Sequence, residues 1–288
     1  MTYSIVAWDS EADEVGVAVQ SCAFGTGAAC AWALPGVGAV ATQSFTERRY
    51  GPDGLSLMRD GAEPGAALDR LLAEDDLRDV RQVAYVDREG RTAAHTGAGC
   101  IPHAGDLQRA GFSVQGNMLR AEEVWPAMAE AFTATPGSLA ERLLEALDGA
   151  EAAGGDFRGR QAAGLVVVTT EPDGSPYERI FDLRVDDHRE PLDELRRLHR
   201  MAAGYRRRNR IAEGADPTEE VAAAREAGLP EHEVQTAEMF AYARNGDLER
   251  VRSLMTEALA AEPLWRAAFE RYEKLGLIPE GLVPTDGR

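Results

Sequence analysis

The sequence has almost no lysine. Lys274 is the only lysine in the chain, so no catalytic lysine is available in the residues before it. Acidic residues outnumber basic ones by 49 to 31, which gives a net charge of −18 and a pI of about 4.7. Nucleic acids and anionic membrane surfaces are negatively charged themselves, so this balance argues against both as partners.

Cysteines and long apolar runs are also scarce. Cys22, Cys30 and Cys100 have no metal-ligand spacing, and an odd number of cysteines cannot complete a disulfide framework. No run of about 18 apolar residues could span a membrane, and the first residues lack the basic and apolar segments of a secretory signal. We therefore predict a cytoplasmic protein, since a reducing compartment suits free thiols.

The chain begins with a strand-like segment. Residues 2–9 are rich in β-branched and aromatic side chains and predict a short buried strand. A second apolar run at residues 15–20 follows the polar turn at 9–13, so the two runs predict a hairpin. Most chain termini fray at the surface, so this start is either an edge strand or a terminus with a functional role.

Further strands and helices follow up to residue 202. Strands are expected at 36–43, 81–86, 91–95, 111–115, 161–170 and 177–185, with a turn at 172–175. Helices are expected at 53–60, 64–74, 119–133, 137–152 and 191–202, where apolar residues recur at helical spacing. Residues 21–35 and 96–110 are expected to form loops. This order predicts an α+β fold in which two antiparallel sheets pack between helices, an αββα sandwich.

The composition changes near residue 206. An arginine-rich run at residues 205–210 is followed by a segment rich in alanine and glutamate. We place an αββα domain at residues 1–205 and a helical domain at 206–288. Its helices are expected at 217–226, 231–245, 247–261 and 264–275. The arginine run is either a solvated linker or a contact with an acidic face, and the helical domain is a candidate interface for a homo-oligomer.

Thr2 is the candidate nucleophile. Methionine is commonly removed in bacteria before a small residue, and loss of Met1 would leave Thr2 with a free α-amine beside its hydroxyl. An α-amine has a pKa of about 7.7–8.0 and can take the hydroxyl proton as threonine attacks a carbonyl. The alternative is that Thr2 is simply the second residue, and a retained Met1 would remove this mechanism. Ser4 shares the strand face with Thr2 and is a lesser candidate.

Seven motifs occur in order along the first 188 residues. They are Thr2–Ala7, Gly36–Gln43, Tyr50–Pro52, His95–Gly97, Val114–Asn117, Gly154–Gln161 and Asp182–His188. Together they resemble the bacterial family called domain of unknown function 1028, which is grouped with the N-terminal nucleophile (Ntn) hydrolases. The resemblance covers roughly residues 1–204 and implies the αββα fold, but it implies no substrate.

A fainter similarity links residues 112–117 to a turn near the catalytic site of proteasome β-type subunits, which also begin with a threonine strand. The catalytic lysine and aspartate of those subunits have no counterpart here. Lysine is absent from the region, and Gln20 and Ser21 stand where the aspartate is expected. The proton relay is therefore left open, and a hydrolase of small amides is favoured over a peptidase.

Polar residues at the expected strand ends are further candidates for the site. Gln115, Gly116 and Asn117 would supply an oxyanion donor, although Gly-Asn is also ordinary turn chemistry. Gln20 and Ser21 would orient the α-amine, or are ordinary polar strand ends.

Substrate-binding candidates also come from strand ends and loops: Thr42, Gln43, Ser44, Arg49, His95 and Arg158. His95 is either a general acid or a hydrogen-bonded histidine. Arg49 and Arg158 would clamp a substrate carboxylate in a bidentate manner, or pair with surface acids. The acidic residues around His188 suit a structural cap better than a metal site, so we predict no metal and no other cofactor.

These observations lead to two hypotheses. The first is an Ntn-type hydrolase that cleaves the C–N bond of a small amide or ureido substrate through Thr2, with an acidic amide as one candidate substrate. The second is a non-catalytic binding or assembly protein on the same scaffold, with the helical tail as partner interface. The missing lysine favours the second hypothesis, and the Met1-Thr2 start favours the first.

Overall fold

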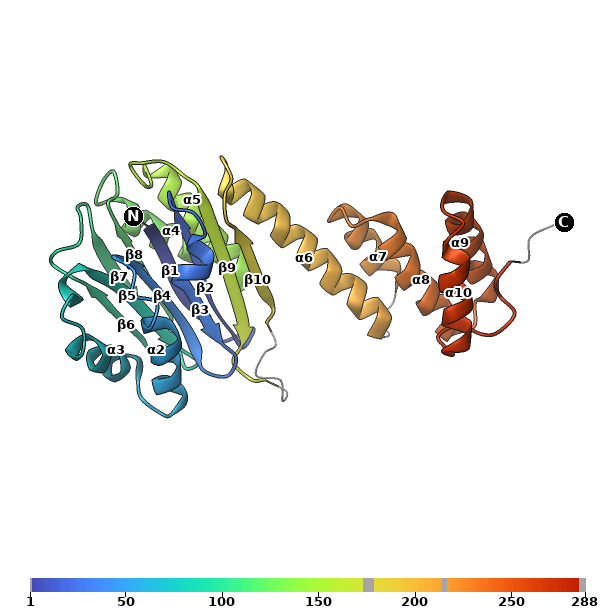
Figure 1. Cartoon of the computed structure of the whole chain (residues 1–288), viewed down its shortest axis with the longest axis horizontal. Coiled ribbons are helices and arrows are strands. Elements are labelled where there is room, and N and C mark those ends of the chain that lie inside the picture. Colours follow the sequence, from blue (N-terminus) through green and yellow to red (C-terminus); the bar gives the residue numbers. More distant parts are fainter. Residues whose placement is uncertain (1, 173–178, 214–216, 285–288) are drawn as a thin grey trace. The chain divides into compact units, whose positions relative to one another are not determined.

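The computed structural model describes residues 2–172, 179–213 and 217–284 (Figure 1). The chain divides into two compact units, residues 1–197 and 198–288, and each is described by itself. The turn expected at 172–175 lies, from residue 173 onward, outside the described residues.

The first unit contains a six-stranded antiparallel sheet in the order β10-β9-β2-β1-β8-β7. Its strands are β1 Thr2–Asp9, β2 Glu14–Ser21, β7 Gly105–Arg109, β8 Phe112–Asn117, β9 Ala162–Thr169 and β10 Phe181–Val185. The hairpin predicted at the chain start is confirmed, because β1 pairs with β2 from Tyr3 opposite Gln20 to Asp9 opposite Glu14. β1 also pairs with β8 on its other side, so the chain starts in the interior of the sheet and not at an edge.

A second antiparallel sheet has the order β3-β4-β5-β6. Its strands are β3 Ala31–Leu34, β4 Gly38–Ser44, β5 Arg81–Asp87 and β6 Thr92–Thr96. Residues 21–35, expected to be a loop, contain helix α1 Thr26–Cys30 as well as β3, and the expected loop 96–110 contains β7. Both expectations were wrong. Strand β3 has only four residues, and β7 is polar and partly exposed, so neither strand gives a clear hydrophobic alternation in the sequence.

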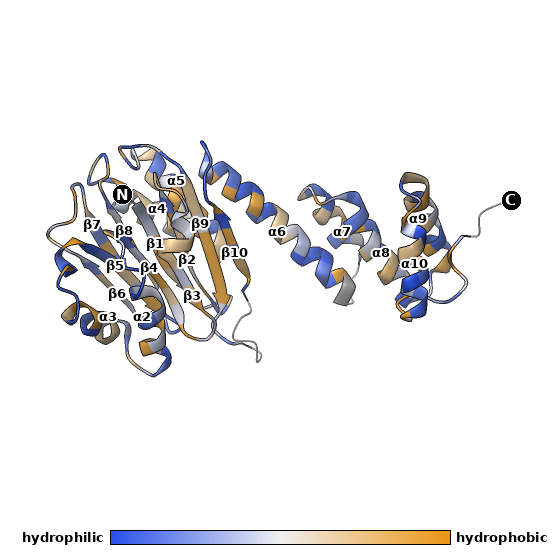
Figure 2. Ribbon diagram, in the orientation of Figure 1, coloured by the Kyte–Doolittle hydropathy of each residue, from blue (hydrophilic) through white to orange (hydrophobic). Residues whose placement is uncertain are grey.

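The two sheets pack face to face, and helices cover both outer faces (Figure 1). Helices α4 Val124–Ala134 and α5 Leu139–Ala152 lie on the six-stranded sheet, while α2 Tyr50–Arg59 and α3 Pro64–Ala73 lie on the four-stranded sheet. A short 3-10 helix, η1 Arg78–Val80, precedes β5. Hydrophobic residues concentrate on strands such as β9 (Figure 2). The α+β class with two antiparallel sheets is therefore confirmed.

Valine and alanine side chains fill most of the space between the sheets. They come from β1, β2, β3, β4, β5 and β9 and form one buried cluster. Each fully buried side chain of this size contributes about 1–2 kcal/mol relative to exposure. The end of the sandwich where β1 begins is different, because there the side chains between the sheets are polar.

The remaining helices are α6 Pro191–Glu213, α7 Pro217–Glu226, α8 Glu231–Asn245, α9 Leu248–Ala261 and α10 Trp265–Lys274. The four helices expected beyond residue 216 are confirmed, two of them with the expected bounds. Gly246 has φ 78° at the end of α8, and the Asp247 carboxylate accepts a hydrogen bond from the Arg250 amide at the start of α9.

The arginine-rich run at 205–210 belongs to helix α6 and is not a linker. Arg207 and Arg210 both pair with Glu220 of α7, and Arg208 pairs with Glu233 of α8. The contact with an acidic face, one of the two roles expected for this run, is thus the one that the structure shows.

Candidate functional site

The alternation of side chains along β1 creates two different environments. Val6 packs between the sheets, so Thr2 and Ser4 face the second sheet as well, whereas Tyr3 points to the opposite face. Thr2 lies opposite Asn117 of β8. The start of β1 therefore meets the ends of its two neighbours, β2 and β8.

Seven side chains from five strands form a buried polar cluster at this end. They are Thr2, Ser4, Ser21, Gln43, Gln82, Gln115 and Asn117. All are hydroxyls or carboxamides, so none of them titrates in the physiological pH range. Six of the seven were predicted site residues, and the structure brings those six together.

Thr2 is anchored at both its side chain and its backbone. Its Oγ1 donates a hydrogen bond to Ser21 Oγ at 3.1 Å. Its carbonyl oxygen accepts from Gln43 Nε2 at 3.0 Å and lies 3.5 Å from Asn117 Nδ2. Only 5% of Thr2 is exposed to solvent. Two sheets therefore hold this residue in one position.

Ser4 is less suited to attack a substrate. Its Oγ donates its proton to Gln43 Oε1 at 2.7 Å and accepts from Gln115 Nε2 at 3.2 Å. Gln115 Nε2 also donates to the Ala41 carbonyl at 3.1 Å. Ser4 is completely buried, so its hydroxyl serves to cross-link the sheets.

Gln82 is the member of the cluster that the sequence prediction missed. Its Oε1 accepts from Gln43 Nε2 at 2.8 Å and from Asn117 Nδ2 at 2.9 Å. Its Nε2 lies 2.8 Å from the Gly116 carbonyl and 3.1 Å from both the Gly105 carbonyl and Thr96 Oγ1. Two amide hydrogens are shared among these three acceptors. The sequence signal that could have found it is the polar Gln82 at the start of the otherwise apolar run 82–86.

Gly116 provides space for the cluster. A Cβ at this position would come within 2.5 Å of the Leu119 side chain, so only glycine fits without a shift. Its carbonyl is bound by Gln82. The predicted oxyanion donors Gln115 and Asn117 both use their amide groups inside the cluster, and an incoming oxyanion would have to compete for those donors.

The loop before β9 covers this end of the six-stranded sheet. Asp156 is buried, and its carboxylate accepts from the Cys22 backbone amide at 3.2 Å and from the Arg158 amide at 2.8 Å. The Arg158 guanidinium also pairs with Asp156 at 3.2 Å. Asp156 therefore links Arg158 to Cys22, which follows Ser21, and balances the charge of Arg158.

A comparison with known families finds a match over the part of the chain that contains the polar cluster and its covering loop. The family described as "Family of unknown function (DUF1028)" matches residues 2–195. The chain belongs to this family. The DUF1028 motifs Thr2–Ala7, Gly36–Gln43 and Val114–Asn117 supply members of the polar cluster, and Gly154–Gln161 supplies the covering loop.

A solved structure of the family agrees with this assignment. The crystal structure of protein SPO2555 from Silicibacter pomeroyi, a DUF1028 protein, is 32% identical, with a TM-score of 0.64 over 70% of this chain and 85% of that one. Anbu (ancestral beta-subunit) from Yersinia bercovieri is also similar, at 10% identity and a TM-score of 0.34 over 68% of this chain and 92% of that one. No curated protein matches the chain.

Other predicted residues of the DUF1028 domain lie outside the polar cluster. Thr42 precedes Gln43 in β4, so it faces the other way, and its Oγ1 donates to the Glu47 carbonyl. Ser44 ends β4 with φ 71°. His95 Nε2 lies 2.8 Å from the Arg78 carbonyl, and Arg49 contacts Glu74.

Gln20 lies beside Tyr3 on the face of the six-stranded sheet opposite the cluster. It is fully buried, and among the described residues neither of its amide atoms has a hydrogen-bond partner. Tyr3 donates to the Glu151 carboxylate of α5. Burial, followed by the negative charge of Glu151, raises the pKa of Tyr3 well above its usual value. This tyrosine therefore stays neutral and holds α5 on the sheet.

An open hollow of about 570 Å³ adjoins the cluster at Cys22. Arg160, Gln161 and residues 187–189 line its other sides. In the described part of the chain, no group of three or more histidine, cysteine, aspartate or glutamate side chains is placed to hold a metal ion. Within the same residues, no helix combines the length and the apolar character needed to cross a membrane.

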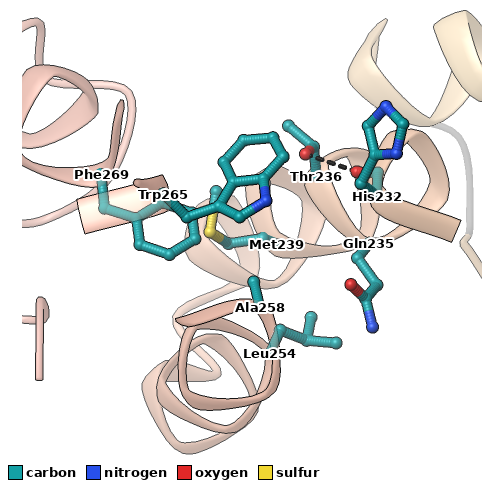
Figure 3. Close-up of a pocket in the computed structure, with 8 residues that line it drawn as sticks. All are labelled: His232, Gln235, Thr236, Met239, Leu254, Ala258, Trp265 and Phe269. Atoms are coloured by element: carbon teal, nitrogen blue, oxygen red, sulfur yellow. Dashed lines mark hydrogen bonds between the residues drawn. The ribbon is translucent and has the colours of Figure 1, made fainter. Parts of the chain in front are cut away.

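The second unit has a hollow of its own between α8, α9 and α10 (Figure 3). Met239, Leu254 and Phe269 line it, and the ring of Trp265 stacks on Phe269 with centroids 5.7 Å apart. Its volume is about 10 Å³, which is room for one water molecule. The hollow therefore belongs to the packing of the three helices and has no room for a ligand.

Proposed function

We propose that the DUF1028 domain of this chain is an Ntn-type hydrolase that cleaves the C–N bond of a small amide or ureido substrate with Thr2 as nucleophile. The observation that carries the proposal is the position of Thr2. It begins an interior strand, its hydroxyl bonds to Ser21, and carboxamides from both sheets lie at its carbonyl. The family resemblance to Ntn hydrolases supports the same assignment.

The α-amine of Thr2 is the base in this proposal, because the polar cluster contains only neutral groups. Removal of Met1 generates the amine, and because an α-amine ordinarily has a pKa of about 7.7–8.0, part of it is neutral near pH 7.5. The neutral amine accepts the Oγ1 proton, and Oγ1 attacks the amide carbon. For this transfer the Thr2 hydroxyl proton turns to the amine from Ser21 Oγ, which lies 3.1 Å from Oγ1 and accepts the proton in the structure.

The remaining steps follow from acyl transfer. The tetrahedral oxyanion accepts a hydrogen bond from Asn117 or Gln115. A free donor contributes about 3–4 kcal/mol of transition-state stabilisation, and the contribution here is smaller because the amide must first leave its present partner. The C–N bond breaks as the ammonium group returns its proton to the leaving amine, which leaves an ester on Thr2. Water then attacks this ester with the amine again as base, and the carboxylic acid is released.

The test combines mass and activity. The intact mass of the purified protein shows whether Met1 has been removed, and a panel of amides and ureido acids is then assayed for amine or ammonia release. We expect Thr2→Ser to retain activity and Thr2→Ala to lose at least 1000-fold, on the order of the effect of other catalytic nucleophiles. Activity that survives Thr2→Ala but is lost in Ser4→Ala would refute the assignment.

A binding or assembly protein on the same scaffold is the second candidate. It is favoured by the hydrogen bonding of the cluster, in which Ser4, Gln43, Gln82 and Asn117 satisfy one another. Such a closed network stabilises a structure without needing any catalytic role. A full-length mass with Met1 retained, and no hydrolysis of any amide, would favour this candidate. The helical residues 206–288 would then be tested as the partner interface.

A further inference from the structure

The two sheets of the DUF1028 domain have four edge strands, and three of them contact a strand of the other sheet. β6 and β7 contact each other, and β3 contacts β2 and β9. β10 is the fourth edge strand (Figure 1). In the described part of the chain, β9 is the only strand that pairs with it. An edge strand leaves the N–H and C=O groups of alternate residues unpaired, so β10 can accept a further strand.

The side chains of β10 alternate between apolar and charged. Leu183 is opposite Leu165, whereas Asp182 is opposite Val166, which packs between the sheets. The apolar side chains therefore lie on one face of the sheet, and the charged ones lie on the face that Val166 shares. The apolar residues are Phe181, Leu183 and Val185, and the charged residues are Asp182 and Arg184.

The two charged side chains of β10 are only partly satisfied within one chain. The Arg184 guanidinium lies 4.0 Å from Asp182 Oδ1, which is too far for a hydrogen bond. This oxygen is buried, and among the described residues it has no hydrogen-bond partner. The other carboxylate oxygen pairs with Arg179. The Arg184 side chain is 46% exposed, so it is available to an acceptor outside its own chain.

A second copy of β10 complements these side chains in one register. When two copies pair antiparallel with Leu183 opposite Leu183, each Asp182 lies opposite Arg184 of the other copy. A shift by two residues places Asp182 opposite Asp182, or Arg184 opposite Arg184, and the like charges repel each other. A shift by one residue brings the apolar face of one copy to the charged face of the other. Only the register centred on Leu183 satisfies both faces.

The signs of the charges distinguish this arrangement from a protected edge. Charged side chains on an edge strand commonly prevent pairing with another chain. Charges of a single sign have this effect on two identical strands, because every cross-strand pair is then repulsive. β10 instead carries one acid and one base, two positions apart, and antiparallel pairing makes them complementary.

We propose that two copies of this chain associate through their β10 strands, so that the two six-stranded sheets become one continuous antiparallel sheet about a two-fold axis at Leu183. Such an interface uses the same surface patch on both copies. It lies on the DUF1028 domain and not on the helical residues 206–288, which the sequence suggested as the interface of a homo-oligomer. This inference requires no catalytic activity.

The test is sedimentation equilibrium of the full chain over a range of concentrations. We expect the wild type to dimerise. Asp182→Arg and Arg184→Glu each turn two attractive cross-strand pairs into two repulsive ones, so each should raise the Kd about ten-fold or more. An equimolar mixture of the two variants should dimerise again, because the two bases of one chain then face the two acids of the other. Recovery in the mixture shows that both variants are folded.

Arg109→Glu is the matched control. Arg109 is an exposed arginine on β7, the other edge of the same sheet, and its reversal should leave the Kd unchanged. A wild type that stays monomeric at every concentration would overturn the proposal. A dimer whose Kd neither β10 variant changes would also overturn it and would direct attention to the helical residues 206–288.

A cross-link tests the register directly. Residues directly opposite each other in an antiparallel pair have Cα atoms about 4.5–5.5 Å apart, which is within the reach of a disulfide. Leu183→Cys should therefore give a covalent dimer under mild oxidation, seen on a non-reducing gel. The wild type, which carries the three native cysteines, is the control and should stay uncross-linked under the same conditions. If Leu183→Cys gives no more covalent dimer than the wild type, the register centred on Leu183 is wrong.

Discussion

Gln82→Ala tests whether the polar cluster holds the two sheets together. The substitution removes the acceptor of Gln43 and Asn117 and the donor to three oxygens, all of them buried or partly buried. Each buried group that is left without a partner costs about 1–3 kcal/mol. Gln43 keeps its bond to the Thr2 carbonyl, so only part of this cost applies. We expect a loss of about 3–5 kcal/mol, a large share of the stability of a typical domain.

The assay is thermal unfolding followed by circular dichroism. A loss of this size lowers Tm by about 6–20 °C for a domain of this length. The matched control is Gln108→Ala, because Gln108 is an exposed glutamine on β7, and its substitution should change stability by less than about 0.5 kcal/mol. If the two variants unfold at the same temperature, the cluster does not stabilise the fold and the reasoning is wrong.

The other predictions concern ionisable groups. The hydrogen bond from Arg81 holds the pKa of buried Asp75 below its ordinary value of 3.8, so this pair stabilises the fold above about pH 4 and the stabilisation is lost as the pH falls further. Asp75→Asn should therefore cost about 3–5 kcal/mol at pH 7, with a Tm difference from wild type that shrinks toward pH 3; a constant difference would contradict this. Burial raises the pKa of the Cys30 thiol to about 11, so iodoacetamide at pH 8 should label the partly exposed Cys22 first. Peptide mass spectrometry checks the order, and equal rates would contradict it.

The sequence alone predicted the elements with strong periodicity. The amphipathic helices and the Val-rich strands were expected within a few residues of their positions, because each carries its own local hydrophobic pattern. Strand β7 was missed because tertiary pairing with β8, and not its own polar sequence, makes it a strand. Helix α6 continues past residue 202 because its arginines are paired with acids of other helices.

The candidate site was predictable only in part. Thr42 and Gln43 are adjacent in one strand, so period-two alternation allows only one of them to reach Thr2. Local sequence cannot say which one, since that depends on which face meets the other sheet. The contacts from Gln43 and Gln82 to β1 and β8 join residues distant in the sequence, and a single sequence contains no signal for that pairing.

The neutral composition of the polar cluster has a consequence for kinetics. The seven side chains of the cluster offer fixed dipoles around Thr2, and as hydroxyls and carboxamides they do not change charge between pH 5 and 9. In the proposed enzyme, the rate–pH curve should therefore rise with a single inflection, and that inflection would be the titration of the chain's own first amine. The mature N-terminus could then be monitored kinetically, without a label, in every preparation of the protein.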